Sequence, residues 1–161
     1  MNGLPIRYIL KKNLDSKQLT TNQIVVEISG GSPTQSTGRA ILITESLLKV
    51  LKNPIICSNF CQAITIDDAV YSNLIFSHIN YLYKANVFFN YENSTIALKN
   101  LDLAGILSSE LVVKPPKQVL EEYNLIFNKI NKAIISYGKE IDILEAHKEL
   151  ILSDLMITKT M

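Results

Sequence analysis

The sequence lacks the residues on which several classes of protein depend. Among its 161 residues there is no tryptophan, and two cysteines are too few for the disulfide framework of a small secreted domain. No apolar run reaches the roughly 18 residues that a membrane-spanning helix needs, and no secretory signal leads the chain. We therefore expect a cytoplasmic protein without a membrane partner, in which the Asn93–Thr95 sequon for N-glycosylation has no meaning.

The sequence also lacks the residue spacings that mark a catalytic or metal site. There is no G-x4-G-K-[ST] phosphate loop. The two cysteines, Cys57 and Cys61, are four residues apart, and with only His78 and His147 a zinc site would need ligands from distant segments. We interpret the cysteines as buried apolar side chains, which disfavours a cysteine-dependent enzyme. We expect no catalytic residue, no metal site and no cofactor.

The composition is that of a folded chain with little net charge. Apolar residues make up 47% of the sequence and charged residues 19%, so one domain, or a domain with an appendage, can bury a core. The net charge is +1, which indicates no particular partner. Residues 1–52 nevertheless contain seven Lys or Arg against three Asp or Glu, a modest basic excess around the polar loop described next.

Two apolar stretches flank a long polar loop. "IVVEI" (24–28) alternates and predicts a half-buried strand, and "AILI" (40–43) predicts its partner strand. Between them "SGGSPTQSTGR" (29–39) is too long for a tight hairpin turn. Its glycines, Gly30, Gly31 and Gly38, allow positive φ and close backbone approach.

The following region predicts further short elements. Residues 54–67 favour two short strands with a bend at Ser58, and Asp67 and Asp68 predict a helix N-cap rather than an ion site. Apolar residues at helical spacing then predict a helix over 71–84. "VFF" (87–89) and "STIAL" (94–98) look like strands.

After Pro115 and Pro116 the apolar period changes to 3.5 residues. The positions concerned are alternately three and four residues apart, and ten of the eleven are apolar, with Lys148 as the exception. This pattern is typical of a coiled-coil seam, and a helix from residue 117 to 155 would be roughly 58 Å long. We expect these eleven residues to form a dimer interface: Leu120, Tyr123, Phe127, Ile130, Ile134, Tyr137, Ile141, Leu144, Lys148, Ile151 and Leu155.

The predicted fold class is therefore α/β, or more strictly α+β, in two parts. Residues 1–114 form a globular domain of mixed helices and strands. Residues 117–157 form one long coiled-coil helix that serves as dimerisation and spacer element.

A globular domain with polar loops, joined through prolines to a heptad helix, resembles the specificity subunit of type I restriction-modification systems. Three segments carry the likeness, which covers most of residues 20–155: "IVVEISGGSPTQSTGRAILI", "SNFCQAITI" and "LKNLDLAGILSSELVVKPPKQVLEEYNLIFNKINKAI". Full subunits of that family have two target recognition domains and two helices. By this resemblance the chain would have one of each and would open part-way into the recognition domain, so it looks like a shortened half-subunit.

The resemblance implies a non-catalytic DNA-recognition subunit. It would bind double-stranded DNA at a bipartite target, and it would position methyltransferase (modification) subunits and a restriction subunit there. A half-subunit would restore this geometry as a homodimer with antiparallel helices, or by pairing with a second half-subunit. The alternative is a truncated structural or regulatory coiled-coil assembly protein without sequence-specific DNA binding.

The resemblance also gives the polar loop a candidate role in binding DNA. Amide and guanidinium groups can read base edges, and hydroxyl groups can bind bases or phosphates. A solvated connection is the alternative for the loop, and a turn or capping role is the alternative for Asn100. The predicted DNA-binding residues are Ser32, Thr34, Gln35, Ser36, Thr37, Arg39, Lys99 and Asn100.

Overall fold

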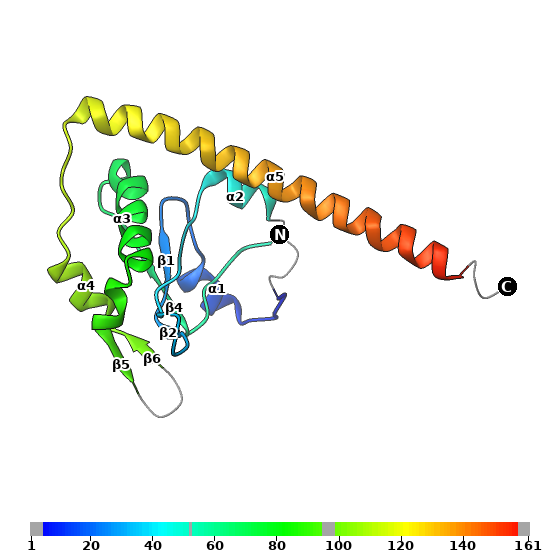
Figure 1. Cartoon of the computed structure of the whole chain (residues 1–161), viewed down its shortest axis with the longest axis horizontal. Helices are drawn as coiled ribbons and strands as arrows, with labels where there is room; N and C mark the ends of the chain where they lie inside the picture. Colours follow the sequence, from blue (N-terminus) through cyan, green and yellow to red (C-terminus); the bar gives the residue numbers. More distant parts are fainter. Residues whose placement is uncertain (1–4, 52, 95–98, 158–161) are drawn as a thin grey trace. The chain divides into compact units, whose positions relative to one another are not determined.

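The computed structural model describes residues 5–51, 53–94 and 99–157, and it combines helices with two small sheets and a long C-terminal helix (Figure 1). The chain forms two compact units. The globular unit is Ile9–Leu125, and the helical unit joins Met1–Tyr8 with Ile126–Met161. Among the described residues, all strands lie in the globular unit.

The first sheet has β1 (Ile24–Glu27) at its centre, between β3 (Ala40–Leu42) and β4 (Cys61–Ile64). Both pairings are antiparallel, and Ile24 faces Leu42 on one side and Ile64 on the other. The predicted strand pair across the polar loop is confirmed. β1 is not half-buried as predicted, however, because Val25 packs with Leu19 and Ile43 on the face opposite to Ile24.

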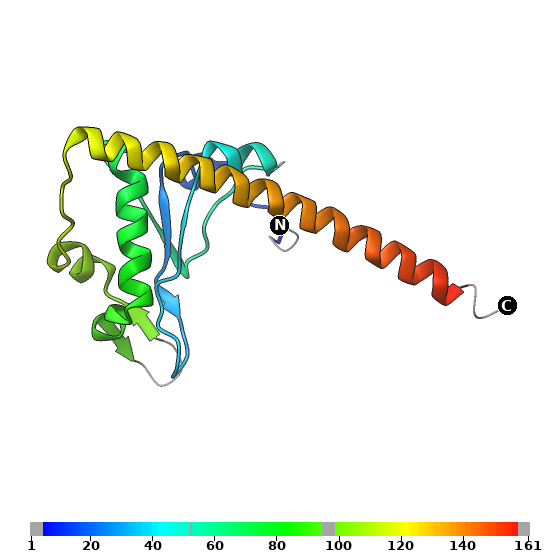
Figure 2. The same ribbon diagram turned by 45° about the horizontal axis from the view of Figure 1, so that its top comes forward.

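The second sheet has the order β2–β6–β5, with every pairing antiparallel. β2 (Ser29–Gly30) follows β1 almost directly, and it pairs with β6 (Lys99–Leu101), which in turn pairs with β5 (Glu92–Ser94). Figure 2 shows β5 and β6 side by side, next to the segment that leaves β1. The start of the predicted loop at residue 29 is thus part of a sheet.

Several helices complete the globular unit, and side chains cap three of them. Thr44 accepts the Leu47 N–H, Asp68 accepts the Val70 N–H, and Asp102 accepts the Gly105 N–H. The predicted Asp68 cap and the helix after it are confirmed. The helices of this unit are α1 (Lys11–Lys17), α2 (Glu45–Val50), a 3₁₀ helix (Ala69–Tyr71), α3 (Ser72–Lys84), a 3₁₀ helix (Val87–Tyr91) and α4 (Leu103–Ser109).

Some sequence predictions of this region are wrong. Residues 87–89 are not a strand, because Asn86 ends α3 in the left-handed conformation (φ 61°) and the chain then continues as a 3₁₀ helix. Only Cys61–Ile64 becomes a strand in the stretch 54–67, where Ile56 forms a single bridge with Gln18. Of the predicted strand 94–98, residue 94 ends β5 and the rest lies outside the described residues.

The core of the globular unit lies between the first sheet, α3 and α4. Its largest fully buried apolar side chains are Phe88, Ile24, Ile79, Ile106 and Val26. They come from four elements, namely β1, α3, the 3₁₀ helix after α3 and α4, so these elements are held together by shared apolar burial.

The long helix α5 (Lys117–Ile157) has 41 residues and begins directly after Pro116, whose carbonyl accepts the Leu120 N–H. Its first turns, up to Leu125, belong to the globular unit. Leu120 is 2% exposed, and the Tyr123 and Asn124 side chains bond to Ser77 and Asn73 of α3.

The remainder of α5, from Ile126 onwards, belongs to the helical unit. Within the described residues we find no helix that has both the length and the apolar character needed to cross a membrane.

A substitution at Gly38 tests how tightly the polar loop is packed. Gly38 has φ 121°, and a Cβ atom there would lie 2.1 Å from Phe88 Cδ2. Gly38→Ala should therefore lower the free energy of unfolding by at least about 2 kcal/mol, through backbone strain and overlap with a fully buried ring. Urea unfolding measures this. Pro33→Ala, at an exposed position of the same loop, is the control and should change stability by less than about 0.5 kcal/mol. Equal effects would show that the loop does not depend on Gly38.

Candidate nucleic-acid interface

The side-chain hydroxyl of Ser32 closes the tip of the polar loop into a turn. Ser32 and Gln35 exchange backbone hydrogen bonds, with Ser32 N–H to Gln35 O at 2.8 Å. The Ser32 hydroxyl also accepts the N–H groups of Thr34 and Gln35, at 3.3 and 3.1 Å. This turn explains a Ser at position 32 without any ligand. Thr34 and Gln35 are exposed at its tip.

Gln35 attaches the turn to α3. Its Nε2 donates to the Tyr83 hydroxyl at 3.0 Å, and the Tyr83 ring meets Phe88 edge-on. The Gln35 side chain remains exposed, so its amide oxygen is still accessible to a base. The loop is therefore held in one place rather than left as a solvated connection.

Ser36 and Thr37 lie in the interior, with 3% and 0% of their surface exposed. The Thr37 N–H donates to Glu92 Oε1 at 2.6 Å, and its hydroxyl has no hydrogen-bond partner among the described residues. In this conformation neither side chain can reach a duplex. They fix the loop, and the candidate interface consists of their exposed neighbours.

Lys99 serves as the counter-charge of a buried acid. Its Nζ lies 2.8 Å from Glu92 Oε2 and 4.7 Å from the centre of the Phe89 ring. The Lys99 side chain is 21% exposed and the Glu92 side chain 4%. Because a buried carboxylate needs a partner, Lys99 is engaged inside the protein. Glu92 thus joins the loop at Thr37 to strand β6.

Arg39 forms a two-point ion pair with Glu27 on the first sheet. Nε lies 3.0 Å from Glu27 Oε2, and Nη2 lies 2.6 Å from Oε1. The Arg39 side chain is 63% exposed and that of Glu27 13%. The hydrogen bonds from Arg39 lower the pKa of the Glu27 carboxyl, and the same contact raises the pKa of Arg39.

The Glu27 contact uses one edge of the guanidinium group and leaves the other edge outward. A guanidinium group has five N–H donors in a fixed plane, and Glu27 takes two. The remaining three, on Nη1 and Nη2, form the edge that binds guanine or a phosphate at two points. The Glu27 carboxylate, bound to the opposite edge, fixes the orientation of the guanidinium group.

Asn100 is exposed in the middle of β6 and pairs with Ser29 on one side and Asn93 on the other. The alternative turn or capping role for Asn100 is therefore wrong. The sequence marks Asn93 only as part of a glycosylation sequon, since nothing local in it places Asn93 opposite Asn100. Only the strand register brings these residues together.

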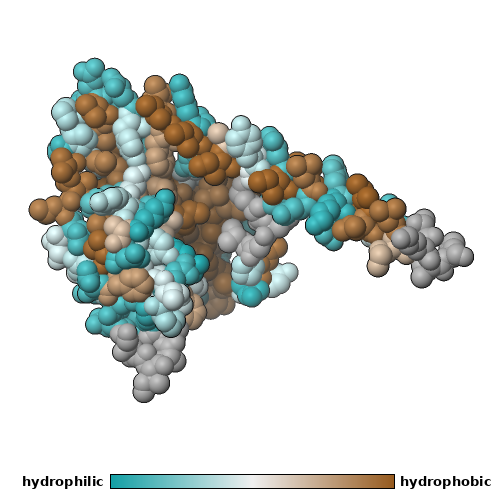
Figure 3. All heavy atoms as spheres, viewed as in Figure 1, coloured by the Kyte–Doolittle hydropathy of each residue, from teal (hydrophilic) through white to brown (hydrophobic). Residues whose placement is uncertain are grey.

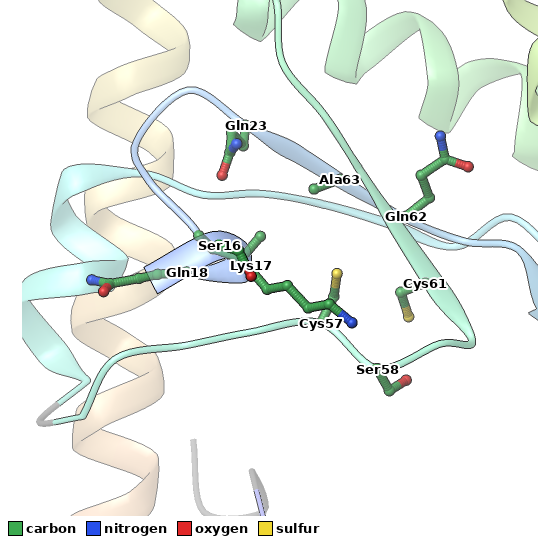
Figure 4. Close-up of a pocket in the computed structure, with 10 residues that line it drawn as sticks. Ser16, Lys17, Gln18, Gln23, Cys57, Ser58, Cys61, Gln62 and Ala63 are labelled. Atoms are coloured by element: carbon green, nitrogen blue, oxygen red, sulfur yellow. The ribbon is translucent and has the colours of Figure 1, made fainter. Parts of the chain in front are cut away.

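A second feature of the globular unit is an open pocket of about 310 Å³ that contains both cysteines (Figure 4). Cys57 and Cys61 are half-buried rather than fully buried as interpreted from the sequence. Burial, and then the neighbouring Cys57, raise the pKa of the Cys61 thiol, which disfavours a reactive thiolate. In the part of the chain that the structure describes, no group of three or more His, Cys, Asp or Glu side chains is placed to hold a metal ion.

The residues of the predicted seam divide between the two units. Leu120 and Tyr123 contact the globular unit's own residues, as described above. Seven further seam side chains, from position 130 to 155, are each 54–65% exposed: Ile130, Ile134, Tyr137, Ile141, Leu144, Ile151 and Leu155. Phe127 is half-buried and Lys148 exposed. Figure 3 shows apolar side chains on the surface of α5 towards its C-terminal end.

Comparison of the sequence with models of known protein families found no match, and comparison with curated proteins found none either. The functional assignment therefore depends on the residues and distances described above.

The Arg39–Glu27 pair predicts a specific pH dependence. Because the Glu27 pKa is lowered in the folded state, its contribution is complete above the ordinary carboxyl pKa and is lost as the pH falls below it. Arg39→Met should cost about 0.5–1 kcal/mol at pH 7, and the difference from wild type should shrink towards pH 3 in urea unfolding. Lys49→Met, which removes an exposed ion pair with Glu45, is the control with little effect at either pH. A difference that stays constant with pH would contradict the account.

Proposed function

We propose that the protein is a non-catalytic DNA-recognition and assembly subunit that works as a pair of copies joined through α5. In the type I restriction-modification systems that the sequence resembles, such a subunit would position methyltransferase and restriction subunits on a bipartite DNA target. The exposed apolar stripe of the helical unit is the observation that carries this proposal. The stripe consists of the seam residues of α5 from Phe127 to Leu155.

The stripe supports pairing with another helix. Its apolar side chains recur every 3.5 residues, which is the spacing that keeps them facing a partner helix over several turns. Seven of them are more than half exposed. Complete burial of a large apolar side chain contributes roughly 1.5–3 kcal/mol. When two copies pair, each buries these seven side chains against the other, so the favourable contribution to the free energy of association is large.

The charge pattern of α5 supports a second antiparallel copy as the occupant. Residues 126–139 contain three lysines and no acid, whereas residues 140–157 contain five acids and one lysine. Antiparallel pairing of two copies places the positive stretch of one beside the negative stretch of the other. Parallel pairing would place like charges together. The three lysines of residues 126–139 lie outside the seam, so the preference acts through the summed field of these charges rather than through individual ion pairs.

An antiparallel pair would place the two globular units at opposite ends of the shared helices. The overlap from Phe127 to Leu155 is roughly 42 Å long, which corresponds to on the order of 12 base pairs at about 3.4 Å each. A two-fold pair fits a symmetric target whose halves are separated by a fixed spacer.

One observation favours the alternative, a structural or regulatory assembly protein without sequence-specific DNA binding. The globular unit, residues 9–125, contains ten Lys or Arg and ten Asp or Glu, so it has no net positive charge to attract DNA. Selection from randomised duplex DNA separates the two functions. Recovery of one bipartite, inverted sequence supports DNA recognition, and recovery of no preferred sequence supports the alternative.

The seam predicts the effect of single charges in α5. Ile134→Asp and Ile141→Asp should each convert the pair to single chains in sedimentation experiments, because each would bury an uncompensated carboxylate at the interface. Ser136→Asp adds the same charge outside the seam and is the control, for which we expect the mass of the pair. An unchanged mass in the two seam variants would count against pairing through this face.

A further inference from the structure

The second sheet presents a row of polar side chains on one face. In antiparallel pairs, residues directly opposite one another share a face, about 5 Å apart. Ser29, Asn100 and Asn93 are opposite one another across β2, β6 and β5. Asn93 and Asn100 are exposed and Ser29 is half-exposed. We name Ser29, Asn93 and Asn100 the amide row.

The other face of this sheet points to the interior and makes the sheet rigid. It contains the buried Leu101 and the Glu92–Lys99 ion pair. The C-terminal end of β6 is tied to neighbouring segments, since Leu101 N–H donates to Ile28 O and Asp102 N–H donates to Tyr91 O, both at 2.9 Å. The amide row therefore rests on a fixed backbone, which lowers the entropy lost when its side chains bind a ligand.

Arg39 is linked to the start of the amide row through its partner Glu27. Glu27 is two residues before Ser29, and a Cβ atom on Gly30 would lie 2.7 Å from Glu27 Oε1. The chain thus passes directly from the Arg39–Glu27 pair to the first residue of the row.

We propose that the amide row reads adenine in the major groove of duplex DNA, through the amide groups of Asn93 and Asn100. An asparagine amide offers one acceptor and two donors, which match adenine N6 and N7 at two points. The outer strands of a three-stranded sheet are about 9.6 Å apart, and the major groove is about 12 Å wide. Strands in a groove are an established means of reading DNA.

The low charge of the globular unit is consistent with this mode of recognition. Lys99, the neighbour of Asn100 on β6, is engaged by Glu92 on the other face of the sheet. Affinity would come from base contacts rather than from phosphate neutralisation. The logarithm of the binding constant should accordingly fall with the logarithm of salt concentration with a slope of about −1 to −2 for each globular unit.

This inference rests on the proposed function, and the test separates the two. Randomised duplex DNA is first selected with the wild-type chain, and the binding constant for the selected duplex is then compared with that of the Asn93→Ala/Asn100→Ala variant. We expect the variant to bind about tenfold or more weakly and to lose its adenine preference. Gln62→Ala removes an exposed amide from β4 in the other sheet and should bind like the wild type.

A second measurement does not depend on the folding of a variant. Selected duplex in which 7-deazaadenine replaces adenine lacks the N7 acceptor, and the wild-type chain should bind it about tenfold or more weakly. If the wild type selects a sequence but tolerates both changes, the inference about the amide row is overturned and the proposed function stands. If the wild type selects no sequence, DNA recognition fails as a whole, and the inference fails with it.

Discussion

The apolar stripe of α5 is the constraint on which the functional account depends. The globular unit has a buried apolar core, which includes Phe88, Ile79 and Ile106. The helical unit instead exposes seven large apolar residues at heptad spacing. Exposed apolar surface of this regularity indicates a partner. The segregation of lysines and acids along the helix is the reason for which we propose a second copy in the opposite direction as that partner.

Two half-buried or buried acids organise the polar surface of the globular unit. Glu92 accepts a backbone N–H of the loop and neutralises Lys99. Glu27 holds Arg39 by two hydrogen bonds and leaves its outer edge exposed. Several of the residues predicted to contact DNA thus have partners within the protein. Some of the predicted residues are buried or paired and hold the loop in place, and the others are exposed.

The sequence predicted the elements with a clear period and missed the contacts between distant segments. The strands on either side of the polar loop, the helix over 71–84 and the heptad helix follow from local apolar spacing. α4 was missed because its Asp102 cap stands in a stretch of mixed polarity. The burial of Thr37 and the alignment of Asn93 with Asn100 depend on strand register, and nothing local in the sequence specifies that register.

Double electron–electron resonance between spin labels tests the antiparallel pair most directly. One label would be attached to Ser153→Cys, an exposed position outside the seam, with Cys57→Ser and Cys61→Ser to remove the native thiols. Antiparallel pairing centred near Ile141 predicts a distance of roughly 35–45 Å between the labels of two copies. A distance of roughly 15–25 Å would show parallel helices, and the absence of any distance between labels would show single chains. Either result would contradict the account.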